Sequence, residues 1–481
     1  MDTVRRYYLS LRQDALDHAT AEQRKCFVSV NGHYCYQHYA CEWGCDVVGS
    51  EVGENINSIQ AHIAFTRGAA RQYGKPWLMD FSSWYGPSIF DEDPRRTWGD
   101  NSGPTNGHSL SLHLRTYYVS YMAGANIVVA EGGWLNGFRS RTPGPDGALP
   151  LSALGQEMAR FYRFTRRHPD RGAPYAPIAL LLPFDHGIYP GFGPKATWNA
   201  FPYNSGDQQT LDTLNALFPG SLGDPAQPER PDHQPDDPSW TDPDYMHTEA
   251  LRLVASPYGD ITDVLLANAR PETLRGYPAI LVAGDHLPDA GLARRLEDYV
   301  NQGGTLLGES GGLRKILPSR LAARLHSSPD LNRQDAKTPR NALRGFTRIR
   351  HGRGAIVVLA SSPAVGPTAD RPMSRAIEEA ARELIPFRIS GRLETLYNRT
   401  KDGWIVTLVN NLGVTKTFFA PPRIDPTASQ VVTVAYCGRG RVRRAVLWGP
   451  DADEELKPTR LKVTVPPGSV RVLKVSLTGA E

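Results

Sequence analysis

Three consecutive segments of the chain repeat one pattern, an apolar strand that ends on a carboxylate and is followed by an amphipathic helix. The strands read DVVGSE at 46–51, PWLMD at 76–80 and NIVVAE at 126–131, and an earlier strand, CFVSVN at 26–31, ends on an amide. Parallel strands joined by helices point their carboxyl ends to one edge of the sheet. We therefore expect Glu51, Asp80 and Glu131 to converge at that edge.

The periodicity of apolar residues predicts helices around these strands. They are expected over 1–25, 55–73, 109–123 and 151–167, with an aromatic-rich loop at 33–44 and a Gly/Pro/Asp-rich loop at 85–107. This gives four β/α units in residues 1–172, whereas a closed (β/α)₈ TIM barrel needs eight. Either the first half of a barrel lies outside this chain, or the four units pair with another copy. We favour the first alternative, because closing a sheet removes its exposed edges.

Strands and helices alternate again in residues 173–385, which predicts a flavodoxin-like, doubly wound α/β domain. Strands are expected at 177–182, 279–284, 304–308 and 355–359, and helices at 258–267, 289–302 and 375–384. The Pro/Asp-rich stretch 219–245 lacks periodicity and is expected to be a surface loop or lid. Residues 386–481 predict a small antiparallel β-sandwich, with strands at 404–409, 431–434, 442–447 and 470–475.

The bulk properties exclude several classes of partner. The net charge is +4 over 481 residues, and we identify no basic stripe of the kind that nucleic-acid binding requires. No apolar run approaches the roughly 20 residues of a membrane span. The amino-terminal residues lack the apolar core of a secretory signal, so we expect a cytoplasmic protein unless the chain is truncated at its start.

Four of the five cysteines lie near the start of the chain, at Cys26, Cys35, Cys41 and Cys45. With His33 and His38 between them, this mixture could bind zinc, but it lacks the usual C-x-x-C pairs. Buried apolar thiols are the favoured interpretation, with Cys35, Cys41 and Cys45 left as open metal candidates. We identify no motif for any other cofactor.

The strand-end carboxylates have the residue type that glycosidic cleavage needs, one acid to protonate the leaving oxygen and one carboxylate to attack or to activate water. The alternative is that they bind sugar hydroxyls or pair with Arg115 or Arg139. Several neighbouring residues suit a sugar subsite, since aromatic faces stack on the CH faces of pyranose rings. These substrate-binding candidates are Asn55, Trp84, Tyr85, His108 and Trp134. Core packing of the aromatic residues and a capping or polar role for His108 are the competing interpretations.

A G-x-S-x-G motif at 308–312 follows a strand, as in the nucleophile elbow of serine hydrolases. We reject that function, because we expect no helix directly after the motif and find no clear acidic partner for His326 or His351.

The predicted order of barrel, flavodoxin-like domain and sandwich resembles glycoside hydrolase family 42 and related β-galactosidases. GKPWLMD at 74–80, continuing to Trp84, looks like the seventh barrel strand of that family, and AGANIVV at 123–129 looks like the eighth. YPAILV at 277–282 through GGTLL at 303–307 looks like its amidotransferase-like domain. The resemblance implies a carbohydrate substrate and a homo-oligomer, trimer or dimer. It also implies a silent amidotransferase-like domain, because residues 173–385 contain no cysteine.

The chain departs from this family at two positions. The resemblance implies a nucleophilic glutamate at the end of the seventh strand, where this chain has Asp80, and an acid/base glutamate on a fourth strand that the chain does not contain. We expect a glycoside hydrolase that uses Glu51, Asp80 and Glu131. The alternative is a non-catalytic carbohydrate-binding or oligomerisation protein derived from a glycosidase fragment.

Overall fold

The computed structural model describes most of the chain, and every structural statement below refers to those residues. They are residues 2–32, 35–53, 59–82, 109–131, 137–138, 142–187, 196–197, 201–202, 204–218, 253, 255–326, 346–359, 372–415 and 422–479. The expected lid at 219–245 lies outside them.

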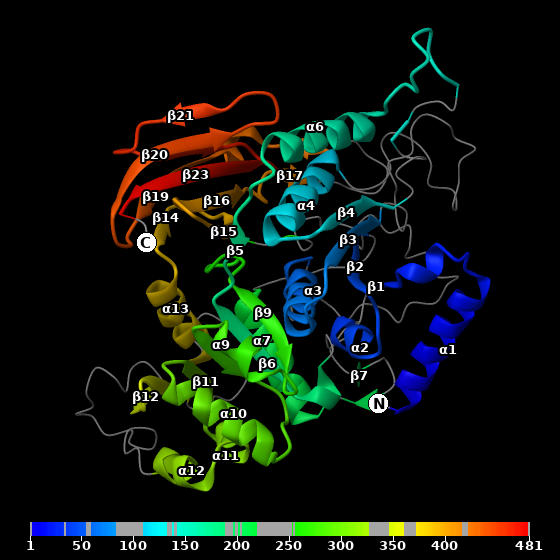
Figure 1. Ribbon diagram of the computed structural model, residues 1–481. Coiled ribbons are helices and arrows are strands. Elements are labelled where there is room, and N and C mark those ends of the chain that lie inside the picture. The colour runs from blue at the N-terminus through cyan, green and yellow to red at the C-terminus, as the bar shows by residue number, and fades with distance from the viewer. Residues whose placement is uncertain are drawn as a thin grey trace.

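The first region is a four-stranded parallel sheet with strand order β1-β2-β3-β4 (Figure 1). Its strands are β1 (Val28–Asn31), β2 (Val47–Gly53), β3 (Trp77–Ser82) and β4 (Ile127–Ala130). Its helices are α1 (Asp2–His18), α2 (Gln37–Glu42), α3 (Ile59–Tyr73), α4 (Leu110–Ala123) and α6 (Ala153–Arg167). Strands that alternate with helices confirm the α/β class.

The two faces of this sheet differ in burial. On one face Ser50 of β2 bonds to His62 of α3, with 3.1 Å between Oγ and Nδ1, and Val48 and Val52 are fully buried. On the other face Val30 and Ile127 remain 37% and 42% exposed. Within the described ranges the four strands form an open sheet and do not close into a barrel. The partial barrel therefore remains a prediction.

The second region contains a six-stranded sheet of order β12-β13-β11-β10-β6-β9, parallel except for the edge pair β12–β13. Its strands are β6 (Ile178–Leu182), β9 (Thr262–Leu266), β10 (Ala279–Val282), β11 (Thr305–Glu309), β12 (Phe346–His351) and β13 (Gly354–Leu359). Its helices are α7 (Ser205–Leu217), α9 (Pro271–Arg275), α10 (Ala290–Asn301), α11 (Ser310–Ile316), α12 (Ser319–His326) and α13 (Pro372–Leu384).

Two sequence predictions of secondary structure were wrong. The helix expected over 258–267 is instead the strand β9, whose five side chains are all buried between neighbouring elements, where an extended run of Val and Leu packs well. The loop expected over 33–44 contains the helix α2, whose side chains from Gln37 to Cys41 are buried. Tertiary burial outweighs the local pattern in both segments.

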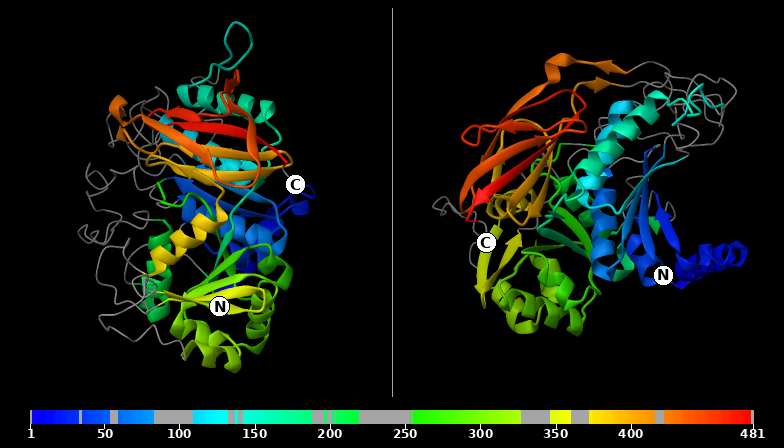
Figure 2. Two further views of the ribbon diagram at one scale, coloured as in Figure 1. Left: turned by 90° about the vertical axis from the view of Figure 1, so that its left-hand side faces the viewer. Right: turned by 45° about the horizontal axis from the view of Figure 1, so that its top comes forward.

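The last region consists of antiparallel strands in two main sheets, as Figure 2 shows from two further sides. One contains β14 (Phe387–Ile389), β19 (Gln430–Tyr436) and β22 (Lys462–Val465). The other contains β21 (Glu454–Leu456), β20 (Arg441–Trp448), β23 (Val470–Thr478), β16 (Gly403–Val409), β15 (Glu394–Thr400) and β5 (Ala173–Pro174). The four strands expected here are confirmed. The two-residue strand β5 belongs to a distant part of the chain and pairs with β15.

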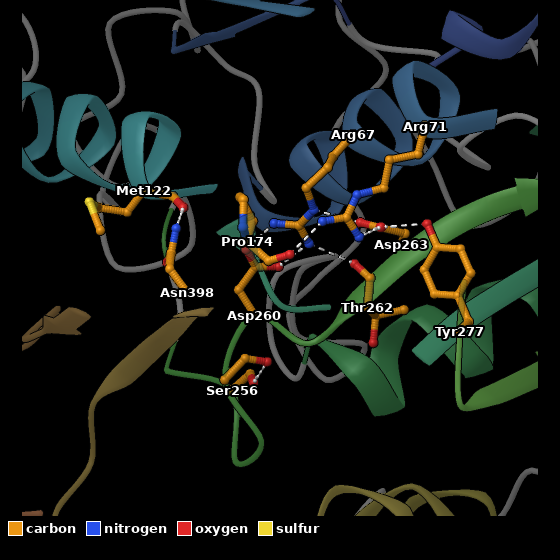
Figure 3. Close-up of polar contacts among 11 residues, drawn as sticks. Arg67, Arg71, Met122, Pro174, Ser256, Asp260, Thr262, Asp263, Tyr277 and Asn398 are labelled. Atoms are coloured by element: carbon orange, nitrogen blue, oxygen red, sulfur yellow. Dashed lines mark hydrogen bonds and ion pairs between the residues drawn. The ribbon is translucent and has the colours of Figure 1, made fainter. Parts of the chain in front are cut away.

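A buried ionic network joins the first sheet to the second (Figure 3). Arg67 of α3 donates to Asp260 and Asp263, each at 2.6 Å, and Arg71 donates to Asp263 at 2.5 Å. The hydroxyl of Tyr277 also donates to Asp263, at 2.7 Å. Arg67 and both aspartates are almost completely buried, so the network fixes α3 against β9.

Gly68 lies directly beside this network and shows how closely α3 approaches β9. A Cβ at this position would lie 1.8 Å from the backbone carbonyl oxygen of Val264. Although alanine normally favours a helix interior, we expect Gly68→Ala to lower the free energy of unfolding by about 1–3 kcal/mol, because the two backbones must separate. Chemical denaturation measures this. Gly311→Ala in α11 is the matched control, since a Cβ there meets no atom within 4 Å.

Candidate active site

The ends of β2, β3 and β4 bring the three predicted carboxylates together. Glu51 and Asp80 are direct partners in the parallel register of β2 and β3, and Asp80 is in register with Val129 of β4. Glu131 lies two residues beyond Val129, and its backbone N–H donates to the carbonyl of Phe81 at 3.0 Å. Side chains two residues apart along a strand share a face, and neighbouring strands lie about 4.8 Å apart. All three carboxylates therefore lie on the open face of the sheet.

Asp80 occupies the middle of this row and has a strongly perturbed pKa. Burial, together with repulsion from Glu131 and Glu51, raises the pKa of Asp80 from 3.8 to about 7. Its Oδ1 atom is buried and has no hydrogen-bond partner among the described residues. At neutral pH, Asp80 is therefore divided between its protonated and ionised forms, which suits proton transfer.

The described residues behind Asp80 bury its carboxyl group but bring no positive charge that would stabilise the ionised form. His113 of α4 lies against Phe81, with 4.3 Å between ring centroids, and burial lowers the pKa of His113 to about 3. The imidazole is therefore neutral at physiological pH. Tyr117 is also buried, and burial together with the charge of Asp80 raises its pKa. This apolar backing explains why Asp80 favours its protonated form.

Arg115, the suggested ion-pair partner for the carboxylates, has a different described contact. Its Nη1 atom donates to Asn411 Oδ1 at 2.6 Å, so it connects α4 to the loop after β16. Arg139, the other suggested partner, lies outside the described residues. All five substrate-binding candidates, Asn55, Trp84, Tyr85, His108 and Trp134, also lie outside them, and their roles remain predictions.

The sequence analysis missed a buried polar cluster behind β2. Ser50 contacts His62 of α3, and the side-chain amide of Gln37 in α2 donates to Ser50 at 3.3 Å. These bonds hold the strand that carries Glu51. A serine next to a strand-end glutamate was visible in the sequence, but its partners lie in helices that follow and precede the strand.

The G-x-S-x-G motif requires a correction. We expected no helix directly after it, yet α11 begins at Ser310 immediately after β11 ends at Glu309. This is a strand-to-helix turn. Among the described contacts no histidine bonds to Ser310, so the described residues show no base that would activate a serine nucleophile there.

The described residues contain no group of three or more His, Cys, Asp or Glu side chains arranged to hold a metal ion. Cys35, Cys41 and Cys45 are buried free thiols, and His33 lies outside the described residues. Across the same ranges, no helix has both the length and the hydropathy needed to cross a lipid bilayer.

The raised pKa of Asp80 also predicts a pH-dependent stability. The pKa of Asp80 is higher in the folded state than in the unfolded state. The stability that Asp80 contributes to the fold is therefore fully present at low pH and is lost as pH rises through about 7. We expect Asp80→Asn to be more stable than the wild type at pH 8, by about 1–2 kcal/mol after allowance for solvent screening of a partly exposed group. The gain should vanish near pH 4. Thermal unfolding at both pH values measures this, with Asp298→Asn on the exposed face of α10 as control.

Comparisons with known proteins agree with this fold. No protein-family model matches the chain, and no curated protein sequence matches it. Among solved structures, a β-galactosidase from Bacillus circulans sp. alkalophilus matches 96% of this chain and 65% of its own, with a TM-score of 0.52 and 13% identity. A β-galactosidase from Rahnella sp. R3 matches 93% of this chain and 63% of its own, with a TM-score of 0.49 and 13% identity.

The chain thus spans less than two thirds of the length of these neighbours. At such low identity the likeness concerns the fold, and we conclude that the chain has a glycosidase-like α/β fold.

Proposed function

We propose that this chain is a glycoside hydrolase-like protein that acts on O-glycosidic bonds, with Glu51, Asp80 and Glu131 as its catalytic carboxylates. The observation that carries the proposal is the row of three acids, in which the central one has a pKa of about 7. Glycosidic cleavage needs two carboxyl groups whose environments separate their pKa values. The glycosidase-like fold supports the same reaction class.

Within this row, Asp80 is the proposed general acid. A group with a pKa near neutrality retains a proton to donate to the leaving oxygen and becomes a base after the proton is transferred. Glu51 and Glu131 flank it and supply the carboxylate that attacks the anomeric carbon or activates water. The resemblance described above implies instead a nucleophile at the position of Asp80, and the two roles predict opposite pH dependences.

A panel of 4-nitrophenyl glycosides, including the β-D-galactoside, tests the proposal. We expect the purified chain to release nitrophenol, and the Glu51→Gln and Glu131→Gln variants to be impaired. Asp298→Asn is expected to match the wild type, because Asp298 is exposed on α10, which belongs to the second region and not to the sheet that carries the carboxylates. Equal rates for the wild type and both glutamine variants would refute the assignment.

The open sheet favours a second candidate, a non-catalytic carbohydrate-binding or oligomerisation protein. Val28, Val30 and Ile127 are each about two fifths exposed, and register places them on the same face as Glu51 and Asp80. This candidate predicts saturable sugar binding or a stable oligomer without turnover. Calorimetry with galactose and light scattering distinguish it from the enzyme.

A further inference from the structure

A cavity of about 280 Å³ lies where the α/β region meets the antiparallel sheets, at the end of α13. The remaining walls come from strands β14, β15, β16 and β19 and from the turn that follows β19. Figure 1 shows α13 and β14 on the opposite side of the molecule from β1–β4. The cavity is therefore separate from the carboxylate row.

The lining of this cavity is strongly cationic. Arg382, Arg388, Arg399 and Arg439 contribute four positive charges, and Glu383 is the acidic residue among the lining residues. Arg382 is paired with Glu378, so the other three arginines are the ones that offer their charge to a ligand. Glu383 is paired with Arg348, at 3.0 Å from Nη1 to Oε1, which reduces its ability to neutralise the four arginines. Guanidinium groups present planar forks of donors that match carboxylate and sulfate oxygens.

Two of the arginines are positioned by contacts with rings or backbone carbonyls. The guanidinium of Arg399 lies 4.0 Å from the ring centroid of Tyr175 and 5.2 Å from that of Trp404, so the two rings position it at the cavity wall. Arg388 donates to the backbone carbonyls of Arg382, Ile385 and Phe387 at 2.8–3.0 Å. These bonds cap the negative end of α13, which would otherwise oppose an anion.

Aromatic rings form another part of the wall. Trp404 and Tyr436 line the cavity, and both pack against Phe387, with ring centroids 5.9 Å and 5.3 Å away. An aromatic surface beside cationic forks suits a ligand with an apolar face and an acidic substituent. At about 280 Å³ the cavity lies just below the usual range of ligand sites, about 300 to 1,000 Å³, so a single ring is the ligand size that suits it.

We propose that this cavity binds one acidic sugar unit, a pyranose whose carboxylate or sulfate group is held by Arg399 and Arg439 and whose ring lies against Trp404. Sugar binding at this cavity would be a second function, and it does not depend on the proposed hydrolysis at the carboxylate row. Both ligands share an oxyanion attached to a sugar ring. Glucuronate supplies it as a carboxylate and galactose 6-sulfate as a sulfate.

Isothermal titration of the whole chain with glucuronate, galactose 6-sulfate, neutral galactose and inorganic sulfate tests this proposal. We expect saturable binding of at least one acidic sugar, and binding at least about tenfold weaker for galactose and for inorganic sulfate. A preference between glucuronate and galactose 6-sulfate identifies which oxyanion the site takes. No saturable binding, or equal affinity for galactose, would overturn the proposal, and equal affinity for inorganic sulfate would show a simple anion site without a sugar.

Three variants locate the binding. Arg439→Gln removes an exposed charge, and we expect about tenfold weaker binding from the lost charged hydrogen bond. Arg399→Lys keeps the charge but loses the planar fork, and should also weaken binding. Arg443→Gln removes another exposed arginine, on β20, that does not line the cavity, and this variant should bind as the wild type does. If Arg443→Gln weakens binding as much as Arg439→Gln, the effect is one of net charge and the site assignment is wrong.

Discussion

Replacing Asp80 with asparagine is expected to reduce glycoside hydrolysis by about 10²–10⁴-fold, the usual contribution of a general acid or base. Asparagine keeps the shape of the side chain and still fits between Glu51 and Glu131, but it has no acidic proton to transfer to the leaving oxygen. The wild-type rate should fall as pH rises through about 7, because burial and the two neighbouring carboxylates raise the pKa of Asp80 to that value. Measurement of kcat/KM from pH 5 to 9 checks both results.

A comparison of two leaving groups distinguishes a general acid from a nucleophile at Asp80. Nitrophenolate departs without a proton, whereas an alkyl glycoside needs one, so loss of a general acid should affect the alkyl substrate far more. A nucleophile at Asp80 would give similar losses with both substrates and a wild-type rate that rises through pH 7. That pattern would contradict the acid role, and an undiminished rate in Asp80→Asn would remove Asp80 from the mechanism altogether.

The second large effect is expected at Arg67. Arg67→Met preserves much of the side-chain volume but leaves Asp260 and Asp263 buried with less compensation, and removal of one partner from a buried ionic pair costs about 3–5 kcal/mol. Denaturant unfolding at pH 7 measures this loss. Arg163→Met is the matched control, since its pair with Asp451 is exposed and such pairs contribute about 0–1 kcal/mol.

The destabilisation of Arg67→Met should shrink in acid. Arg67 and Arg71 outweigh the burial of Asp263 and lower its pKa, so the stability from this pair is present above the ordinary aspartate pKa and is lost as pH falls through the lowered value. In the variant the carboxylates protonate more readily. A loss at pH 7 no larger than that of Arg163→Met would show that the network does not stabilise the fold.

The sequence predicted the repeating strand-and-helix order well, because each strand combines an apolar run with a terminal carboxylate. Register in β2 and β3 then places Glu51 beside Asp80, as parallel topology requires. The same reasoning failed at β9, where Thr262–Leu266 carries too short a pattern to distinguish strand from helix. Its identity depends on β6, which lies about 80 positions earlier in the sequence and pairs with it.

The pKa of Asp80 could not be predicted from the sequence, because it too depends on contacts between distant segments. The raised pKa of Asp80 depends on how deeply the side chain is buried and on its two acidic neighbours, and only the second factor was visible in the strand ends. The network around Arg67 joins residues nearly 200 positions apart, and no local pattern indicates it. The two residues of β5 are likewise too few to show a period.

The anchoring of α3 restricts movement between the first two sheets. This helix begins six residues after β2 ends, and its buried Arg67 ties it to Asp260 and Asp263 beside and within β9. Hinge closure of one sheet over the other would break those bonds, so the two sheets form a single rigid platform. For the proposed function, sugar preference should therefore not depend on movement between the two sheets.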